Sequence, residues 1–362
     1  MTHRRPLEGL RVIEAGIALA GPFAGSLLAE LGAHVIKVEK PGGGDPMRLM
    51  GPSVEDVAVW WGVAARAKHC VDLDLKERAG KEIFLRLIRD ADVLVENYRP
   101  GVMNRLGLGW PDLKKINPRL IMLSISGFGQ TGPESGRPGF GKIAEALSGI
   151  VELTGRPDDV AMHIGFSLAD TSTGLTGFLG VALALYQRDL AGGSGAHIDL
   201  ALYEPLLRMN ECQLALRERL GRSPLREGTN DPYGWGASGA ANAQKPFKSA
   251  DGHWIMVSLA SLRAKAPAGE DAEAWAADCI GAREHDAALR HLAKLGVAAV
   301  LVHDGATLPH SSYFLERKDV VRAIDPKIGE VVVPGEVPKA YAEPELPLFR
   351  ATRPNEDAQC IT

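Results

Sequence analysis

The sequence predicts an α/β protein in which a parallel sheet carries helices on both faces. Short apolar, β-branched runs alternate with segments of helical periodicity, and the first three such elements occupy residues 10–16, 21–32 and 33–39. The helical segment ends at Gly32, and glycine is typical of a helix C-terminus. Short apolar strands separated by amphipathic helices indicate βα units, whose strands run parallel and are buried on both faces.

The same alternation continues through residue 216. We expect a helix over 76–91, a strand over 92–97, a short helix over 109–117, a buried strand over 119–129, and a further strand and helix within 197–216. These elements extend the βα pattern of the first three, so one parallel sheet accounts for more than half of the chain.

The composition changes after about Gly221. A loop rich in glycine, asparagine and alanine follows and is interpreted as a linker or a domain boundary. Residues 248–261 then predict a hairpin with its turn at Asp251 and Gly252, before an alanine-rich helical part. The last residues, from 331 onward, are rich in proline and have no helical period, so they must pack against something to be ordered.

Composition and charge narrow the class of protein. A chain of 362 residues with 45% hydrophobic residues can bury a large core and form more than one domain. Its net charge of −4 gives no overall attraction to nucleic acid or to an anionic membrane, so neither is expected as a partner. The longest apolar stretch, 174–186, is interrupted by glycine and is expected to be too short to span a bilayer.

The N-terminus lacks the apolar region of a signal peptide, so we expect a cytoplasmic protein. The four cysteines lie far apart, without a Cys-x-x-Cys motif, at positions 70, 212, 279 and 360. This spacing argues against a disulfide scaffold and against a zinc site, and no metal is expected.

The loops that follow the predicted strands are the candidate binding segments, because ligands bind at the carboxyl ends of the strands in an open parallel sheet. The first loop contains neither Gly-x-Gly-x-x-Gly nor the Gly-Lys-Ser/Thr of a phosphate loop, and Pro22 removes one backbone donor. A nicotinamide dinucleotide or ATP site is therefore disfavoured.

Basic residues recur at these strand ends and in the loops after them. Each one by itself is usually a solvated surface charge, but several at one edge of the sheet would form a phosphate-binding rim. Such a rim suits a ligand that carries several phosphates. The residues in question are Lys37, Lys40, Arg48, Lys76, Arg99 and Arg105.

The stretch "SLADTSTGL" places a carboxylate, Asp170, just ahead of an apolar run. From this stretch alone a helix N-cap is the commoner role, because Asp accepts hydrogen bonds from the free N–H groups of a first helical turn. The chain shows no Gly-x-Ser-x-Gly motif, no Cys/His pairing and no histidines at metal-ligand spacing. Asp170 is therefore also the best candidate nucleophile by elimination, and both roles stay open.

Four segments in order resemble the class III coenzyme A transferase family, which includes formyl-CoA transferases, carnitine CoA-transferase and α-methylacyl-CoA racemases. They are "LAGPFAGSLLAELGAHVIKVEKPGGGDPMR" (19–48), "VDLDLKERAGKEIFLRLIRDADVLVENYRPGVMNRLGLG" (71–109), "NPRLIMLSISGFGQTGP" (117–133) and "LADTSTGLTGFLGVALAL" (168–185). The resemblance is close over residues 7–216 and thinner afterwards.

The resemblance implies a large Rossmann-like domain with a parallel sheet, formed by residues 1–222 and completed by 320–362. It implies a smaller α+β domain over 240–310, with linkers at 223–239 and 311–319. It further implies an interlocked homodimer in which each chain threads through the other, which would give the proline-rich tail its packing partner.

The resemblance also implies an enzyme that moves coenzyme A from an acyl-CoA thioester to a free carboxylic acid. Asp170 would be the nucleophile, passing through a mixed anhydride and an aspartyl-CoA thioester. Coenzyme A, as substrate and product, would lie along the strand ends, where the residues carried over from the family are Leu19, Ala20, Lys40, Leu73, Asp74, Leu75, Lys76, Asn97, Tyr98, Arg99 and Arg105. The phosphate rim predicted from the basic residues coincides with this site.

Two alternatives remain at this stage. Racemases of the family use a histidine in addition to the aspartate, and the corresponding position here is Phe140, which argues against proton abstraction on both faces of a carbon. A non-catalytic subunit of a hetero-oligomeric transferase has no need of a nucleophile, so Asp170 argues against that reading. We also expect the loop 234–244 to close over the intermediates. The part after Ser261 is short for the family and the tail is atypical, which leaves the acyl group open.

Overall fold

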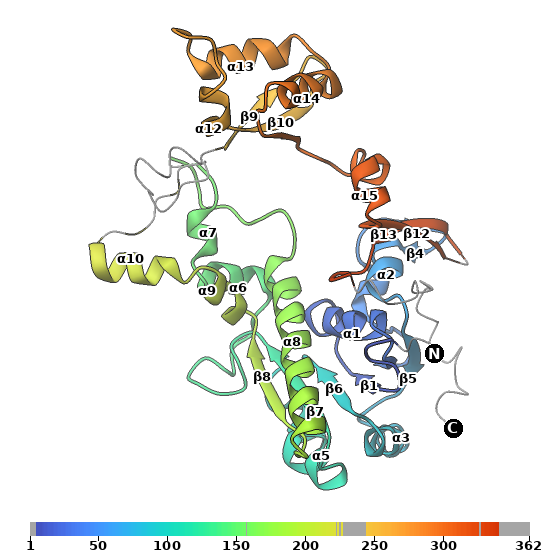
Figure 1. The fold of residues 1–362 in the computed structure, drawn as a ribbon. Coiled ribbons are helices and arrows are strands. Elements are labelled where there is room, and N and C mark those ends of the chain that lie inside the picture. Colours follow the sequence, from blue (N-terminus) through green and yellow to red (C-terminus); the bar gives the residue numbers. More distant parts are fainter. Residues whose placement is uncertain are drawn as a thin grey trace. The chain divides into compact units, whose positions relative to one another are not determined.

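The computed structural model describes residues 5–156, 158–221, 223, 226, 244–325 and 327–339 (Figure 1). The chain divides into two compact units, one of residues 1–148, 164–209 and 315–362 and the other of 149–163 and 210–314. The domain boundaries expected from the sequence stay predictions. The linker 223–239, apart from residues 223 and 226, and the tail from 340 lie outside the described residues.

The first unit is built on a sheet of six strands in the order β5-β2-β1-β6-β7-β8, and every neighbouring pair is parallel. The predicted α/β class with a parallel sheet is therefore confirmed. The chain builds outward from β1 to β2 and β5 and then returns to the other side of β1 with β6, β7 and β8. This reversal makes the gap between the ends of β1 and β6 the switch point, where a crevice for ligands forms in such sheets.

Five of the six strands coincide with the predicted ones to within a few residues, and β5 is the one that was not predicted. Their interior positions are almost all buried, because parallel strands are covered on both faces. In chain order they are β1 (Arg11–Glu14), β2 (His34–Glu39), β5 (His69–Asp72), β6 (Val93–Glu96), β7 (Ile121–Ser126) and β8 (His197–Ala201).

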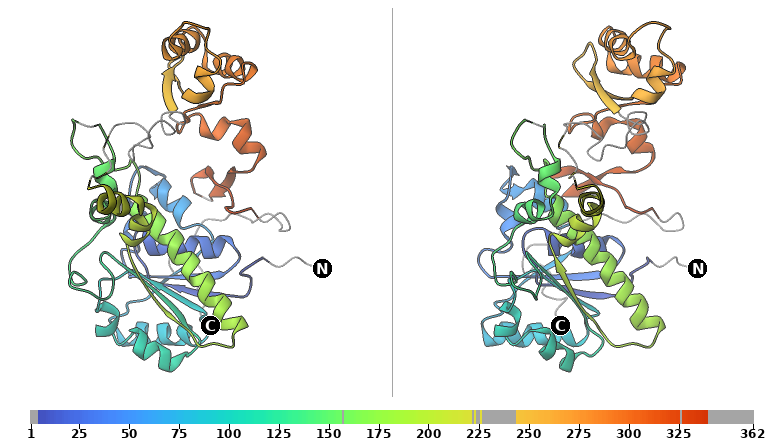
Figure 2. Two further views of the ribbon diagram at one scale, coloured as in Figure 1. Left: turned by 60° about the vertical axis from the view of Figure 1, so that its left-hand side comes forward. Right: turned by 90° about the vertical axis from the view of Figure 1, so that its left-hand side faces the viewer.

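Helices cover both faces of the sheet (Figure 2). On one face, α3 (Arg78–Arg89) and α5 (Trp110–Ile116) bury apolar side chains such as Phe84 in one cluster with Met122 of β7. On the other face, the next residue of β7, Leu123, lies against Gly177 of α8 (Leu168–Leu190). Side chains alternate along a strand, so consecutive residues of β7 serve the two different layers.

The second unit contains the predicted hairpin. Strand β9 (Gln244–Lys248) pairs antiparallel with β10 (Trp254–Ser258), and Gly252 of the turn has a φ of 89°. Strand β11 (Ala299–Leu301) pairs on the other side of β10. An apolar core joins this sheet to the three helices that lie between β10 and β11 in the chain. These are α12 (Leu259–Arg263), α13 (Ala272–Gly281) and α14 (His285–Lys294).

Shorter elements complete the described chain. Before β8 in the chain they are α1 (Ala20–Glu30), η1 (Pro46–Leu49), β3 (Ser53–Val54), β4 (Val57–Ala58), α2 (Val59–Ala64), α4 (Val102–Arg105), α6 (Gly141–Leu147) and α7 (Ile150–Leu153). After β8 come α9 (Glu204–Met209) and α10 (Cys212–Leu220), where a single helix had been expected, and later η2 (Leu308–His310), α15 (Ser312–Glu316) and the antiparallel pair β12 (Val320–Asp325) and β13 (Gly329–Pro334).

Helix α8 corrects the expectation that its apolar stretch is too short to span a bilayer. It runs for 23 residues with a mean hydropathy of 1.3 over its most apolar window, which is enough by length and composition alone. Core helices of globular proteins share these properties, and 39% of this window is buried inside the protein. One side of α8 packs on α1 and the sheet, while the side chains of Leu175, Leu179, Leu183, Tyr186 and Leu190 form an exposed apolar stripe.

The contact between α8 and α1 depends on a missing side chain. A Cβ atom at Gly174 would lie 2.8 Å from the carbonyl oxygen of Ala20 and 2.8 Å from the ring of Phe23. Both distances are too short for carbon in a packed interior, so the two helices can approach this closely only with glycine at this position.

We therefore expect Gly174→Ala to lower the free energy of unfolding by about 1–3 kcal/mol, because the clash outweighs the better helix propensity of alanine. Gly180→Ala is the matched control on the same helix, since a Cβ there meets Ile198 at an ordinary 3.6 Å. Denaturant unfolding followed by circular dichroism measures both variants. Equal stability of the two would contradict the packing argument.

Candidate active site

The amide side chain of Asn97 bridges the two sides of the switch point. Asn97, directly after β6, accepts a hydrogen bond from the N–H of Ile17 (2.7 Å) and donates one to the carbonyl of Ile17 (2.8 Å). A Cβ at Gly16 or Gly21 would come within 3.2–3.3 Å of the Asn97 side chain. Asn97 thus ties the loop after β1 to the end of β6. Its assignment to coenzyme A stays a prediction, because both of its polar groups serve the loop.

Four of the predicted basic residues lie exposed at the carboxyl ends of the strands. Lys40 follows β2, Lys76 follows β5, and Arg99 and Arg105 follow β6. Because these strands are parallel neighbours around the switch point, the four cations lie along one edge of the sheet. This placement is the one that a rim for phosphate groups requires.

Two other residues predicted for the rim are paired with buried acids, and the prediction is wrong for Lys37, whose side chain is not exposed. The Lys37 side chain is fully buried and pairs with Glu14 and Asp45 at 2.7 and 2.8 Å. Arg48 pairs with Glu39 at 2.6 Å and lies over the Trp61 ring at 4.0 Å. The sequence shows that a cation lies in or after a strand, but not whether a buried acid already neutralises it.

Most of the remaining residues predicted to contact coenzyme A are apolar and buried. Leu19, Ala20, Leu73 and Leu75 are buried, and Tyr98 is half-buried. The carboxylate of Asp74 accepts a hydrogen bond from the N–H of Lys76 at 2.9 Å, which fixes the turn after β5.

A cavity of about 490 Å³ opens at the same edge of the sheet. The glycines 42–44 line it together with Arg48, Trp61 and Asp72. It therefore lies beside the ends of β2 and β5, next to the exposed Lys40.

Asp170 is the third residue of α8, and no described side chain caps this helix at Ser167. The N-cap role predicted from the local sequence is therefore wrong. Its carboxylate instead lies over Gly141, the first residue of α6, where a Cβ would be 2.1 Å from Oδ2. Only a residue without a side chain can occupy position 141 beneath this carboxylate.

The backbone near Gly141 is brought in by a second close approach. A Cβ at Gly139 would lie 2.8 Å from the Cα of Gly127, and Gly127 directly follows β7. The glycines of "SGFG" and "PGFG" thus let two backbone segments touch. As a result the Asp170 carboxylate is held near the carboxyl end of β7, on the same edge of the sheet as the exposed cations.

The surroundings of Asp170 make its charge costly. Burial, and then the neighbouring carboxylate of Glu145, raise the pKa of Asp170 to about 6, while its own backbone N–H and Lys142 lower it. Glu145 is fully buried and accepts hydrogen bonds from Lys142 Nζ at 2.9 and 3.1 Å. Near neutral pH the Asp170 carboxylate is therefore mostly ionised but poorly solvated, which suits a nucleophile.

Lys142 and Glu145 are the site residues that sequence reasoning missed. Lys142 Nζ also donates to the carbonyls of Ile164 and Phe166 at 2.9 and 2.8 Å, so it ties α6 to the segment that leads into α8. Their spacing of three residues in "GKIAEAL" fits one helix face, which was the available signal. Phe140, at the position compared with the racemase histidine, is 68% exposed and directly precedes α6.

The turn of Asp170 lies next to the start of α1. Gly174 is one helical turn after Asp170, and it contacts the carbonyl of Ala20, the first residue of α1. The structure thus brings Leu19 and Ala20 beside the helix of the candidate nucleophile. The loop 234–244, expected to close over the intermediates, lies outside the described residues except for Gln244.

The second unit holds a small cluster of possible metal ligands, Asp251, His253 and His285, within 4.8 Å of one another. The Asp251 carboxylate accepts hydrogen bonds from the Ser249 hydroxyl (2.6 Å) and from the N–H of His285 (3.1 Å). These bonds fix the hairpin turn to the start of α14, which gives the cluster a structural role.

A doubly wound α/β sheet with exposed cations and a half-buried carboxylate near the carboxyl ends of its strands is typical of proteins that bind an anionic ligand at those ends. The sequence pattern of CoA-transferase family III matches residues 7–268, and the chain belongs to this family. The protein is accordingly an enzyme that transfers coenzyme A between an acyl-CoA thioester and a carboxylic acid.

Individual relatives agree with this assignment. Succinyl-CoA–D-citramalate CoA-transferase of Chloroflexus aurantiacus is 34% identical over 367 residues, which cover 94% of this chain and 89% of that protein. The beta subunit of succinyl-CoA–L-malate CoA-transferase from the same organism is 42% identical over 262 residues, 72% of this chain and 63% of that protein. A crystal structure of a CAIB/BAIF family protein from Brucella suis has a TM-score of 0.85 at 29% identity and covers 99% of each chain.

The raised pKa of Asp170 predicts a pH-dependent gain in stability for Asp170→Asn. A carboxyl whose pKa is raised on folding favours the folded state only while protonated, and this contribution is lost as pH rises from about 4 to about 6. We expect the free energy of unfolding of Asp170→Asn to exceed that of the wild type by about 1–2 kcal/mol at pH 7.5, and the two values to agree near pH 4.

Urea unfolding at both pH values measures this effect. Asp112→Asn, at an exposed acid on α5, is the control and should change stability little at either pH. A wild type that is as stable as Asp170→Asn at pH 7.5 would show that the carboxylate is not strained by its surroundings.

Proposed function

We propose that Asp170 carries the transfer as a covalent nucleophile. Its carboxylate attacks the carbonyl carbon of the acyl-CoA thioester, and the C–S bond breaks. The CoA thiolate departs, and a mixed anhydride of the acyl group and Asp170 remains. The thiolate then attacks the aspartyl carbonyl, which releases the donor acid and leaves an aspartyl-CoA thioester. The incoming carboxylate repeats these two steps in reverse order, so that it leaves as the new thioester and Asp170 is regenerated.

The placement of the Asp170 carboxylate is the observation that carries this proposal. The carboxylate lies over the bare backbone of Gly141, one turn from the contact between Gly174 and Ala20. Partial burial excludes water from it, which protects an anhydride and a thioester against hydrolysis. Burial also raises the pKa of Glu96, at the end of β6, to about 7, but that carboxyl is 3% exposed and accepts a hydrogen bond from the N–H of Tyr98.

The coenzyme A part of the substrate is proposed to follow the strand ends. Exposed Lys40, Lys76, Arg99 and Arg105 would hold its phosphates by charge-assisted hydrogen bonds. Helix α1 starts without a side-chain cap, so the N–H groups at its start, apart from Pro22, which has none, can donate hydrogen bonds to an anion. The buried Leu19 and Leu73 would line the path of the uncharged pantetheine arm.

For the acids we propose a short dicarboxylic acceptor with succinyl-CoA as donor. The two relatives described above are named for succinyl-CoA and for citramalate or malate, which are short dicarboxylic acids. Assays should therefore begin with succinyl-CoA and a panel of such acids.

Substitution of Asp170 tests the mechanism directly. We expect Asp170→Asn to lose at least about 10³-fold in kcat, because neither intermediate can form without the carboxylate oxygen. In the wild type, hydroxylamine added during turnover should convert the aspartyl thioester into a hydroxamate at Asp170, detected by peptide mass spectrometry. Coenzyme A should still bind both proteins.

Other outcomes would point to the alternatives. Exchange of the α-hydrogen of an acyl-CoA with deuterium, without a hydroxamate, would support a racemase. Coenzyme A binding with no transfer for any acid would support a non-catalytic subunit of a hetero-oligomer.

We further propose that the chain works as a homodimer, with a hetero-oligomer as the alternative. The exposed apolar stripe of α8 supports this, because its residues 175, 179, 183, 186 and 190 are each 53–71% exposed. A continuous apolar face of this kind usually marks an interface. An interlocked arrangement, as the family resemblance implies, would also cover the proline-rich tail.

A charge in the stripe tests the dimer. We expect Leu183→Glu to shift the protein from dimer to monomer, because an unpaired carboxylate would have to be buried at the interface. Light scattering after size exclusion measures the mass. Ile116→Glu, at an exposed apolar residue of α5, is the control and should stay dimeric. A monomeric wild type would contradict the proposal.

A further inference from the structure

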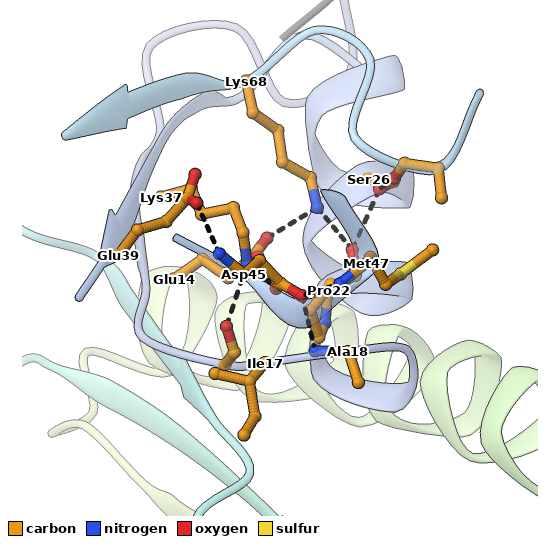
Figure 3. A network of polar contacts seen from close by, with 12 residues as sticks. Glu14, Ile17, Ala18, Pro22, Ser26, Lys37, Glu39, Asp45, Met47 and Lys68 are labelled. Carbon is orange, nitrogen blue, oxygen red and sulfur yellow. Dashed lines mark hydrogen bonds and ion pairs between the residues drawn. The ribbon is translucent and has the colours of Figure 1, made fainter. Parts of the chain in front are cut away.

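A buried network of charges lies behind the loop that joins β1 to α1 (Figure 3). Glu14, Lys37, Asp45 and Lys68 are each at most 1% exposed. Lys37 Nζ lies 2.7 Å from Glu14 and 2.8 Å from Asp45, and Lys68 Nζ lies 2.7 Å from Glu14. Two cations and two anions balance, but buried ion pairs of this kind often stabilise a fold no better than apolar residues would. Their role must therefore be sought in what they contact.

Three of these side chains bind the backbone of the loop or of the first turn of α1 (Figure 3). Lys37 Nζ donates to the carbonyl of Gly16 at 2.9 Å, and Lys68 Nζ donates to the carbonyl of Pro22 at 2.6 Å. Between them, Asp45 Oδ1 accepts from the N–H of Ala18 at 3.1 Å. The loop is thus held at its start and at its centre, and the first turn of α1 is held directly after it.

The centre of the loop needs this support. Ala18 has a φ of 58°, in the left-handed region that a residue with a Cβ rarely adopts. Such a conformation persists only where the surroundings impose it, and it is found most often at functional sites. The hydrogen bond from Ala18 to Asp45, with the two bonds of Asn97 to Ile17, imposes it here.

The strained turn determines where α1 starts. Leu19 and Ala20 follow Ala18 directly, and the Ala20 carbonyl meets Gly174, one turn from Asp170. A shift of the loop would move the start of α1 along the helix that carries the proposed nucleophile.

We infer that Asp45 is a positioning residue for the coenzyme A thioester. It holds Ala18 in the left-handed conformation, while Lys37 anchors the start of the loop and Lys68 anchors the first turn of α1. The loop is then preformed before substrate arrives and presents the thioester arm at α1 to Asp170. This inference rests on the proposed function and goes beyond it by assigning a role to residues that do not touch the substrate.

The variants Asp45→Ala and Asp45→Asn test the inference. Asp45→Ala removes the acceptor of the Ala18 N–H, and we expect it to raise the KM for acyl-CoA and the Kd for free coenzyme A about tenfold. The KM for the acid acceptor should stay within about twofold, because the acid does not bind the loop. Asp45→Asn keeps an acceptor oxygen, so it should recover most of the affinity. Asp112→Asn, at an exposed acid of α5, is the matched control.

The measurements are initial-rate kinetics and calorimetric titration with free coenzyme A. A role in folding alone would lower kcat and the active fraction without changing the Kd for coenzyme A, and this pattern would overturn the inference. So would equal loss of affinity in Asp45→Ala and Asp45→Asn.

Hydrogen exchange of the wild type keeps the test open if Asp45→Ala does not fold. A preformed loop predicts slow exchange at Ile17 and Ala18 without ligand, with little change when coenzyme A is added. Fast exchange that slows only with coenzyme A would overturn the inference. A wild type that binds coenzyme A without transferring it would overturn the proposed function alone, whereas normal transfer by Asp45→Ala would overturn the inference alone.

Discussion

The structure depends on how the chain satisfies the backbone of the loop between β1 and α1. The carbonyl of Gly16 and the N–H of Ala18 have no helix or sheet partner, and a buried polar group left unpaired is costly. Lys37 of β2, Asp45 of the loop after β2 and Asn97 after β6 supply the partners, and Lys68 bonds the first turn of α1 that follows. The loop therefore takes a single shape, which in turn sets the position of α1.

The second constraint is the close contact of helices and backbone around Asp170. Glycines at 141 and 174 remove the side chains that would separate α6 and α1 from the first turns of α8. This packing shields the carboxylate and raises its pKa to about 6. The packing of α8 against α1 and the sheet offsets the destabilisation that the shielded charge causes. A shielded but ionised carboxylate is what acyl transfer through an anhydride requires.

Charge is divided between these two layers in a consistent way. The cations inside the sheet, Lys37 and Lys68, are neutralised by Glu14 and Asp45 and serve the fold of the loop. The cations outside it, such as Lys40 and Arg99, are exposed at the strand ends and face solvent. Only the second group can attract the phosphates of a ligand, so the apparent basic rim of the sequence is smaller in the folded protein than in the chain.

The sequence by itself determined the α/β class, five of the six strands of the parallel sheet, the hairpin at Asp251 and Gly252, and the candidate Asp170, because apolar periodicity and turn residues act locally. Only the tertiary structure decided that Asp170 lies over Gly141 rather than capping α8, that Lys37 and Arg48 are paired, and that Glu145 and Lys142 stand beside the carboxylate. Each of these depends on residues that are distant in sequence or on the side of a helix that faces the core. Local patterns carry no information about such contacts, which arise only when the layers pack.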